Sequence, residues 1–258
     1  MLPYVYIVVP MYGVFCALGV IAALVILYPR AKKYGVSVMH TVQVCIFMII
    51  GMILGSKILF LLTQLDTLIS NFSVELLAER FITGGFVFYG GLFGALIGIW
   101  LYVAIRKFDK KALFNMFTPC IPMFHAFGRI GCMMSGCCYG IEFPWGIEMA
   151  TSPGVVRFPV QLAESICDVF ILIAILLIER KRSQNEALLP IYMISYAVCR
   201  FLLEFLRGDE IRGYFLCFST SQWIALGVLV FYGIKIFILH NRKTESINEV
   251  RQEEKIQE

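Results

Sequence analysis

The sequence predicts an all-α integral membrane protein with about seven transmembrane helices, its N-terminus outside the cell and its C-terminus in the cytoplasm. Three observations support this fold class. Of the 258 residues, 59% are hydrophobic and 16% are charged, whereas about 25% are charged in a typical soluble protein. The hydrophobic residues occur in long blocks. Most Lys and Arg residues lie on alternate connections between these blocks.

Seven apolar segments are predicted to cross the membrane, because a helix of about 20 apolar residues spans the hydrocarbon core. No basic residue or small-residue cleavage site marks the first segment as a signal peptide, so we expect a retained helix. The third contains six glycines, which fits a tightly packed helix or a broken, re-entrant segment. The fourth is short and contains Pro119 and Pro122. The segments are residues 5–27, 38–62, 84–105, 112–127, 162–178, 188–205 and 221–239.

Basic residues predict the orientation of these segments. The connections after the first, third and fifth segments, together with the tail, contain 14 of the 22 Lys and Arg residues, so they are predicted to be cytoplasmic. The net charge of +4 follows from this topology and implies no nucleic-acid partner. Residues 1–239 are predicted to form one transmembrane domain, and residues 240–258 a charged cytoplasmic tail that is solvated or disordered. Residues 66–80 suit a short helix lying at the membrane interface.

The most informative polar stretch is residues 124–140, where His125, Arg129 and three cysteines interrupt an apolar sequence. An arginine at membrane depth costs about 2.5–3.5 kcal/mol even on the most lenient insertion scales. His125 precedes Arg129 by four residues, so the two side chains share one face if the helix continues this far. This stretch is therefore the predicted working site.

Further polar residues lie at the outer ends of other segments. Arg200 and Glu204 are four residues apart, so they share one face of the sixth segment, with Arg207 one turn further along. A surface facing lipid does not tolerate such a cluster, so we expect these groups to face one another. The residues predicted to join them at the same depth are Lys57, Gln161 and Glu164.

Arginines in such a cluster favour phosphate chemistry. Guanidinium groups bind phosphate through paired N–H donors, and at low dielectric constant they stabilise a phosphate leaving group as its charge develops. Arg129 has no carboxylate three or four residues away, which favours a functional role. Arg200 with Glu204 fits a structural ion pair equally well, and Lys57 fits a snorkelling side chain. The predicted ligand is a phospholipid headgroup.

At these residues the chain resembles the prolipoprotein diacylglyceryl transferase family. The likeness runs nearly from end to end, and the family's seven spans with an outside N-terminus match the predicted topology. The stretches that carry it are Tyr12-Gly13, Gly51 to Lys57, Tyr89 to Gly94, Gly128-Arg129-Ile130-Gly131 with its continuation to Gly140, Pro159 to Glu164, and Arg200 to Arg207.

The resemblance implies a reaction at the outer face of the bacterial cytoplasmic membrane. Family members transfer the diacylglyceryl group of phosphatidylglycerol to the lipobox cysteine thiol of a preprolipoprotein, forming a thioether and releasing glycerol phosphate. No metal and no cofactor are implied. The implied partners are phosphatidylglycerol, the signal peptides of preprolipoproteins and membrane lipids.

The resemblance also implies roles for individual residues. Arg129 binds the headgroup and helps the phosphate to leave, while Arg200 and Glu204 complete the polar wall. The implied substrate-binding residues are Tyr12, Gly90, Gly91, Gly136, Gly140, Gln161 and Arg207.

The general base differs from the family pattern. Tyr89 stands where the family usually has a histidine, and a tyrosine, with an unperturbed pKa of about 10, acts as a base only if neighbouring arginines lower that pKa. His125 is therefore the better candidate, and both residues are retained as catalytic predictions.

Cys132, Cys137 and Cys138 leave three interpretations open: packing or a structural disulfide, a substrate-facing role, or a metal site. The spacing C-x₄-C-C matches no familiar zinc motif. Two other function classes also remain open. A membrane thiol oxidoreductase would use these three cysteines, and a small-molecule transporter would use the glycine-rich third segment.

Overall fold

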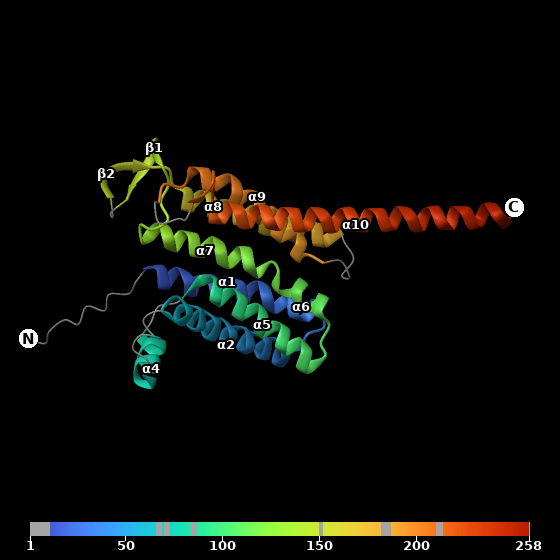
Figure 1. The fold of residues 1–258 in the computed structure, drawn as a ribbon, viewed down its shortest axis with the longest axis horizontal. Helices are drawn as coiled ribbons and strands as arrows, with labels where there is room; N and C mark the ends of the chain where they lie inside the picture. The colour runs from blue at the N-terminus through green and yellow to red at the C-terminus, as the bar shows by residue number, and fades with distance from the viewer. Residues whose placement is uncertain are drawn as a thin grey trace, which may run out of the picture. The chain divides into compact units, whose positions relative to one another are not determined.

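The computed structural model describes residues 11–65, 69, 73–83, 87–149, 152–181, 187–209 and 214–257, some of them by their backbone alone. Figure 1 shows the order of the helices and strands along the chain, which divides into two compact units. Unit 1 comprises Met1–Leu27 with Phe117–Glu258, and unit 2 comprises Tyr28–Met116. Each unit is described by itself.

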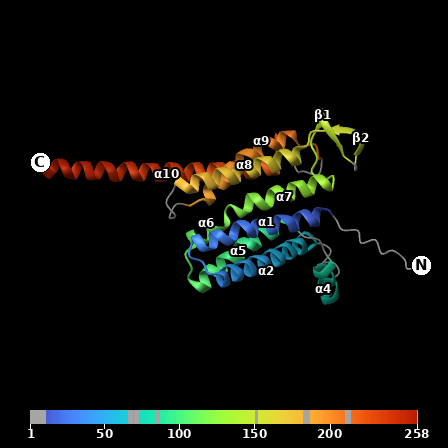
Figure 2. The same cartoon turned by 180° about the vertical axis from the view of Figure 1, so that it is seen from behind.

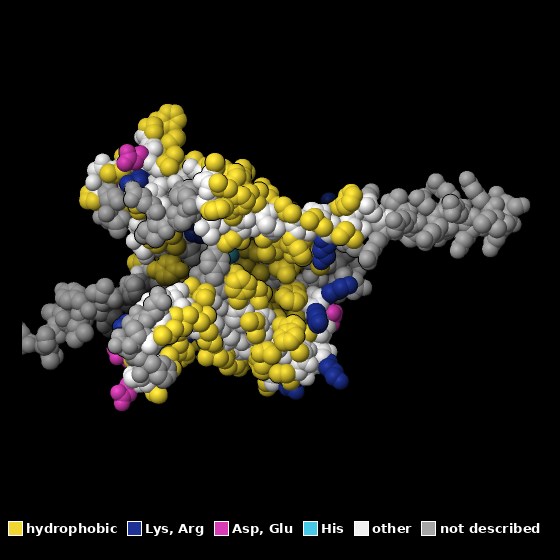
Figure 3. Space-filling model, viewed as in Figure 1, with side chains coloured by type: hydrophobic (Ala, Val, Ile, Leu, Met, Phe, Trp, Pro, Cys, Tyr) yellow, Lys and Arg dark blue, Asp and Glu magenta, His cyan; other side chains and the backbone are white. Residues whose placement is uncertain are grey.

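Helices long and apolar enough to cross a membrane make up about half of the described chain. Their exposed side chains are large and hydrophobic; Val25 and Phe170, for example, are 68% and 66% exposed. Figure 3 shows such side chains over the sides of the helices. The mostly helical membrane fold is therefore confirmed. Among the described residues the candidate spans are α1 (Met11–Lys33), α2 (Val38–Thr63), α8 (Val160–Lys181), Leu189–Leu206 and the first part of α10 (Thr220–Gln257). The fourth of these consists of α9 (Leu189–Leu203) and the 3₁₀ turn η1 (Glu204–Leu206).

Close packing of α2 against α5 (Phe88–Arg106) forms the centre of unit 2. The two helices run side by side in Figures 1 and 2. A Cβ atom added to Gly51 would collide with the carbonyl oxygen of Gly94, and one added to Gly94 would collide with that of Gly51. Gly55 and Gly90 face each other in the same way. Of the two possibilities left open for the glycine-rich segment, the structure therefore has the tightly packed helix over α5. Residues 84–86 of that prediction lie outside the described residues.

We expect Gly94→Ala to destabilise the protein by about 1–3 kcal/mol, because the new methyl group overpacks the contact with the Gly51 backbone. Gly227→Ala in α10 is the matched control, since a Cβ there meets no atom within 4 Å and alanine favours the helix. The measurement is thermal unfolding of both variants in detergent. Equal melting temperatures for the two variants would contradict the packing account.

Buried basic side chains link the ends of the helices in unit 2. Arg30 donates from Nε to the Met116 carbonyl at 3.0 Å and from Nη2 to the Asn115 carbonyl at 2.7 Å. Lys57, expected to snorkel, is instead 6% exposed and donates from Nζ to the Ile82 carbonyl at 3.2 Å. This carbonyl belongs to α4 (Val74–Thr83), which accounts for part of the short helix predicted over residues 66–80. Residues 66–68 and 70–72 of that prediction lie outside the described residues.

The fourth apolar segment, predicted over residues 112–127, is two helices. Helix α6 (Lys110–Phe117) ends before the Thr118-Pro119 turn, and α7 (Cys120–Met134) begins after it. Proline lacks the N–H that a continuous helix needs. Helix α7 then extends beyond the predicted end, so Arg129 lies on the same helix as His125, one turn further along. The shared face expected for these two residues is confirmed.

Three helix pairs form the core of unit 1: α7 packs on α8, α8 on α9, and α9 on α10. The buried centre between α8 and α9 consists of Ile171, Ile175, Leu188 and Tyr192. Because lipid is as apolar as these side chains, close van der Waals packing rather than removal from water stabilises this pair of helices.

Two small antiparallel sheets correct the all-α prediction. Strand β1 (Glu142–Met149) pairs with β2 (Ser152–Arg157), and β3 (Tyr214–Phe215) pairs with β4 (Phe218–Ser219). The first hairpin lies at the end of α7 and α8 (Figures 1 and 2). Its pattern is irregular because the register shifts between Glu142 and Ile147, so sequence alternation did not reveal it. Trp145 at its edge is 88% exposed, as suits a membrane–water interface.

The charged tail is also different from its prediction. Helix α10 continues without a break from Thr220 to Gln257, and its last part extends beyond the other helices of unit 1 (Figures 1 and 2). Residues 240–257 are therefore helical, which corrects the disordered alternative and leaves the solvated cytoplasmic tail a prediction.

Candidate active site

A buried carboxylate joins two arginines from neighbouring helices of unit 1. Glu164 lies in the first turns of α8 with its side chain 6% exposed. Its Oε2 lies 3.1 Å from Nε of Arg129 on α7, and its Oε1 accepts a hydrogen bond from Nη1 of Arg200 on α9. Three helices thus meet at one carboxyl group, which fixes both guanidinium groups.

The second terminal nitrogen of Arg200 is also occupied. Nη2 lies 2.7 Å from Oε2 of Glu204, one turn further along, and donates to Oγ of Ser221 at 3.0 Å. The hydroxyl of Ser219 donates to Oε1 of Glu204 at 2.7 Å. The i,i+4 pair predicted from the sequence is therefore confirmed as an ion pair, within a network that includes β4 and the start of α10.

Arg207 forms a bidentate pair with Asp209 at 3.0 and 2.7 Å, and its Nη1 lies 4.0 Å from Oε1 of Glu164. An antiparallel bridge to Gly140 holds its backbone. The polar cluster therefore contains three arginines, each with at least one donor directed at a carboxylate.

Arg129 differs from the other two arginines in the donors it keeps. Only its Nε is paired, with Glu164. The described part of the chain offers no hydrogen-bond partner to its two Nη groups, and its side chain remains 20% exposed. A guanidinium group that is fixed at Nε and open at both Nη atoms is suited to bind a phosphate through a pair of parallel N–H donors.

Asp168 belongs to the same site and was missed by the sequence analysis. It lies one turn after Glu164 on α8, is 2% exposed, and lines a small cavity beside Arg129. The signal was available, since an aspartate inside an apolar segment and four residues after Glu164 must share its helix face. The other residues lining this cavity are Glu164, Cys167, Tyr196, Cys199, Arg200 and Leu203.

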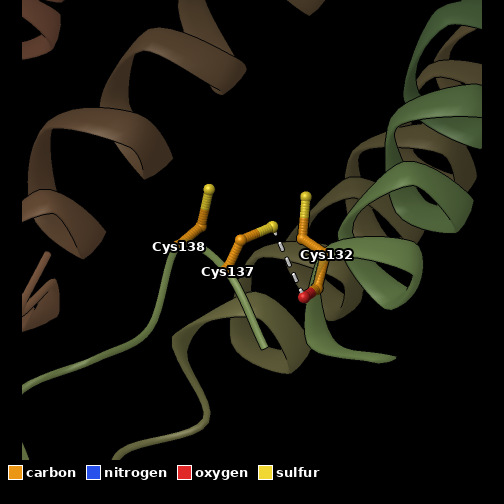
Figure 4. A group of neighbouring side chains, drawn as sticks. All are labelled: Cys132, Cys137 and Cys138. Atoms are coloured by element: carbon orange, nitrogen blue, oxygen red, sulfur yellow. Dashed lines mark hydrogen bonds between the residues drawn. The ribbon is translucent and has the colours of Figure 1, made fainter. Parts of the chain in front are cut away.

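Cys132, Cys137 and Cys138 form a compact group, with their sulfur atoms within 4.8 Å of one another (Figure 4). All nine cysteines of the chain are free thiols. The hydrogen bond with the Cys132 thiol lowers the pKa of Cys138, and the positive charges of Arg207 and Arg129 lower it further. Burial raises the pKa of Cys137.

Gln161 holds the loop that carries these cysteines. It is fully buried at the start of α8, and its Nε2 donates to the Cys137 carbonyl at 2.7 Å. Gly136 has a φ of +67°, a conformation that favours glycine, at the turn after α7. A Cβ on Gly140 would collide with the Phe158 carbonyl oxygen, so glycine is needed there for close backbone packing.

His125 is held by two tyrosines of α9. Its Nδ1 lies 3.1 Å from the hydroxyl of Tyr192, and its ring is tilted against that of Tyr196 with centroids 5.3 Å apart. Tyr12 on α1 is 47% exposed and lies near Gly131, where an added Cβ would come within 3.2 Å of its ring. Both residues are therefore on or next to the helix that carries Arg129.

The remaining predicted residues belong to unit 2. Gly90 and Gly91 lie on α5 and are covered by α2: an added Cβ would meet the Gly55 carbonyl oxygen at the first and the Met52 side chain at the second. Tyr89 is part of the α5 backbone, but its side chain lies outside the described residues. The structure thus brings together Arg129, Arg200, Glu204 and Arg207 around Glu164, with His125 on α7 and Gln161 on α8.

Known proteins resemble this chain along most of its length. The sequence profile of the prolipoprotein diacylglyceryl transferase family matches residues 2–239. A phosphatidylglycerol–prolipoprotein diacylglyceryl transferase of Clostridium tetani is 35% identical over 232 residues, covering 88% of this chain and 91% of the relative. A protein of Clostridium perfringens named phosphatidylglycerol–prolipoprotein diacylglyceryl transferase 2 is 32% identical over 238 residues, covering 90% and 91%. One from Dehalococcoides mccartyi is 29% identical over 244 residues, covering 92% and 91%.

Proposed function

The chain belongs to the prolipoprotein diacylglyceryl transferase family, and on this premise we propose that it transfers the diacylglyceryl group of phosphatidylglycerol to the lipobox cysteine of preprolipoproteins. The observation that supports the proposal most strongly is the state of Arg129. Its Nε is fixed by Glu164, while its two Nη groups have no hydrogen-bond partner among the described residues. This is the donor arrangement that a phosphate headgroup needs.

The reaction is a displacement at a glyceryl carbon. The thiol sulfur of the lipobox cysteine forms a bond to the carbon that carries the phosphate ester, and the carbon–oxygen bond to phosphate breaks. The electron pair of that bond leaves with glycerol phosphate, and the thiol proton passes to a base. Arg129 stabilises the charge that develops on the departing phosphate, while Glu164 and Arg200 hold Arg129 in place.

His125 is the proposed base for the incoming thiol. In the tautomer this role requires, Nδ1–H donates to the Tyr192 hydroxyl, and Nε2 is the nitrogen that accepts the thiol proton. His125 is one helical turn before Arg129, which places base and headgroup on the same face of α7. Tyr89 is the alternative base, and Arg200, Glu204 and Arg207 form the wall of the site.

We expect His125→Gln to lower the transfer rate most at neutral pH, because the thiol must then lose its proton without a base. The defect should shrink as the pH approaches the pKa of a free cysteine thiol, about 8.5, where the substrate supplies thiolate itself. The measurement is the rate of peptide lipidation from pH 6 to about pH 9 in parent and variant. An equal defect at every pH would assign His125 a structural role through Tyr192.

The topology belongs to the same proposal. We place seven spans in the cytoplasmic membrane of a bacterium, with the N-terminus and the active site toward the outer face and the C-terminus inside. The basic residues on alternate connections support this orientation. Lys and Arg side chains are visible at the end of unit 2 where α6 lies (Figure 3). The proposed site can then meet both phosphatidylglycerol and the signal peptide of an exported preprolipoprotein.

Lipoprotein processing in living cells tests the proposal. A bacterial strain depleted of its own transferase should regain lipidated lipoprotein when it expresses this chain, and should not regain it with the Arg129→Ala variant at equal protein level. A thiol oxidoreductase or a transporter would leave unlipidated precursor in both cases. That result from the parental chain would reject the proposed activity.

A further inference from the structure

The three thiols beside the arginines converge on one small volume. The Sγ atoms of Cys132, Cys137 and Cys138 all lie within 4.8 Å of one another. In Figure 4 the three side chains come from the end of α7 and the loop after it, and their sulfurs lie close together on one side of the backbone. A disulfide uses two thiols, whereas three convergent thiols are the arrangement of a metal-ligand set.

The local backbone is shaped so that the thiols converge. The Cys137 amide donates to the Cys132 carbonyl at 3.1 Å, which closes the turn that brings the loop back to α7. Cys138 has a φ of +56°, a left-handed conformation that a residue other than glycine rarely adopts. Gln161 fixes the same loop through the Cys137 carbonyl. Backbone strain of this kind persists where the surrounding structure enforces it, and it clusters at functional sites.

The donor set selects the kind of metal. Cysteine thiolates are soft ligands that bind Zn²⁺ and related d¹⁰ cations in preference to Mg²⁺ or Ca²⁺. Zn–S bonds of about 2.3 Å place the sulfurs of a tetrahedral site ~3.8 Å apart, so small side-chain rotations bring the three sulfurs to that spacing. Three thiolates around a divalent cation have a net charge of −1, which the nearby charges of Arg129 and Arg207 offset.

We propose that Cys132, Cys137 and Cys138 bind one thiophilic divalent cation of the zinc type, with a fourth coordination position open to the thiol of the substrate. Among the described residues, the group of potential ligands that includes these cysteines contains no fourth member. Zinc sites with three protein ligands characteristically leave the fourth position to water or substrate. Cys137 is exposed, so the open side is accessible.

The use of that fourth position rests on the proposed function. A peptide thiol that binds there replaces a water ligand and passes its proton to the base proposed above, so that the sulfur reaches the site as a thiolate. Cys138 is close enough to Arg129 to interact with its charge. The nucleophilic sulfur and the phosphate leaving group would therefore be held in one site. Both would lie next to the glyceryl carbon, which passes from the phosphate oxygen to the sulfur.

Cadmium binding by the full chain tests the site independently of transfer. We expect the reduced, detergent-purified protein to bind one Cd²⁺ per chain and to give the ultraviolet charge-transfer band of cadmium thiolates. Cys138→Ser should weaken Cd²⁺ binding by more than about tenfold. Cys217→Ser is the matched control, because Cys217 is also a free thiol in a connecting segment but lies in the turn between β3 and β4. Cys132→Ser and Cys137→Ser repeat the test if Cys138→Ser elutes as an aggregate.

A second arm tests the open position. A lipobox peptide should increase the absorbance of the cadmium–thiolate band by the contribution of one further thiolate ligand. The same peptide with serine in place of cysteine should leave the absorbance unchanged. No Cd²⁺ bound by the reduced parent, or equal binding by Cys138→Ser and Cys217→Ser, would overturn the metal site. Metal binding with no response to the cysteine peptide would overturn the open position. Metal binding in a protein that fails the cell-based test would reject the transferase function and retain the site.

Discussion

Replacing Arg129 with alanine is expected to abolish diacylglyceryl transfer while the protein remains folded in the membrane. Arg129 is the arginine of the cluster whose Nη donors have no hydrogen-bond partner among the described residues. Loss of a single donor to a developing anion lowers catalytic rates by about 100- to 1,000-fold, and here two donors and a positive charge are lost together. The measurement is lipidation of a lipobox peptide by membranes that contain equal amounts of parent and variant.

Two further variants make this prediction specific. Arg129→Lys should restore little activity, because a point charge replaces a planar pair of donors. Arg180→Ala is the matched control, since Arg180 is an exposed arginine at the far end of α8. If membranes with the Arg129→Ala protein lipidate the peptide at the rate of the Arg180→Ala protein, the headgroup site is elsewhere.

Replacing Glu164 with glutamine is expected to have the second-largest effect, on both stability and activity. Glu164 is 6% exposed and is the carboxylate shared by Arg129 and Arg200. Removing one partner of a buried ion pair leaves the other charge uncompensated, at a cost of about 3–5 kcal/mol. The released guanidinium groups also lose their orientation, so the transfer rate should fall with the melting temperature.

The measurement is thermal unfolding in detergent alongside peptide lipidation. Glu142→Gln is the control, because Glu142 is an exposed residue of β1 and its charge is already solvated. A melting temperature of Glu164→Gln equal to that of Glu142→Gln would mean that the shared carboxylate does not hold the three helices together.

The sequence predicted the parts of the site that local spacing determines. Arg200 and Glu204 are four residues apart on an apolar segment, and the structure pairs them at 2.7 Å. His125 and Arg129 share α7 for the same reason. Helical periodicity places such residues on one face whatever the tertiary structure, so this information is present in the chain itself.

Other features depend on tertiary geometry and were missed or left open. The convergence of Cys132 with Cys137 and Cys138 requires the left-handed backbone at Cys138, which no residue type there signals. The β1–β2 hairpin has an irregular register that hides the strand alternation. The glycines of α5 were compatible with a broken segment until their opposing backbone in α2 was known. The chain breaks between α6 and α7 at Pro119, but hydropathy alone predicted one continuous segment there.

The central claim is that this chain moves a diacylglyceryl group from phosphatidylglycerol to a thiol, and mass spectrometry of a single reaction tests it most directly. Purified full-length protein in phosphatidylglycerol-containing vesicles is incubated with a lipobox peptide. The account predicts a peptide heavier by one diacylglyceryl group in thioether linkage, with one glycerol phosphate released per peptide modified. It also predicts no product from the peptide with serine in place of cysteine. Peptide recovered unmodified, or converted to a disulfide without release of glycerol phosphate, would contradict the account.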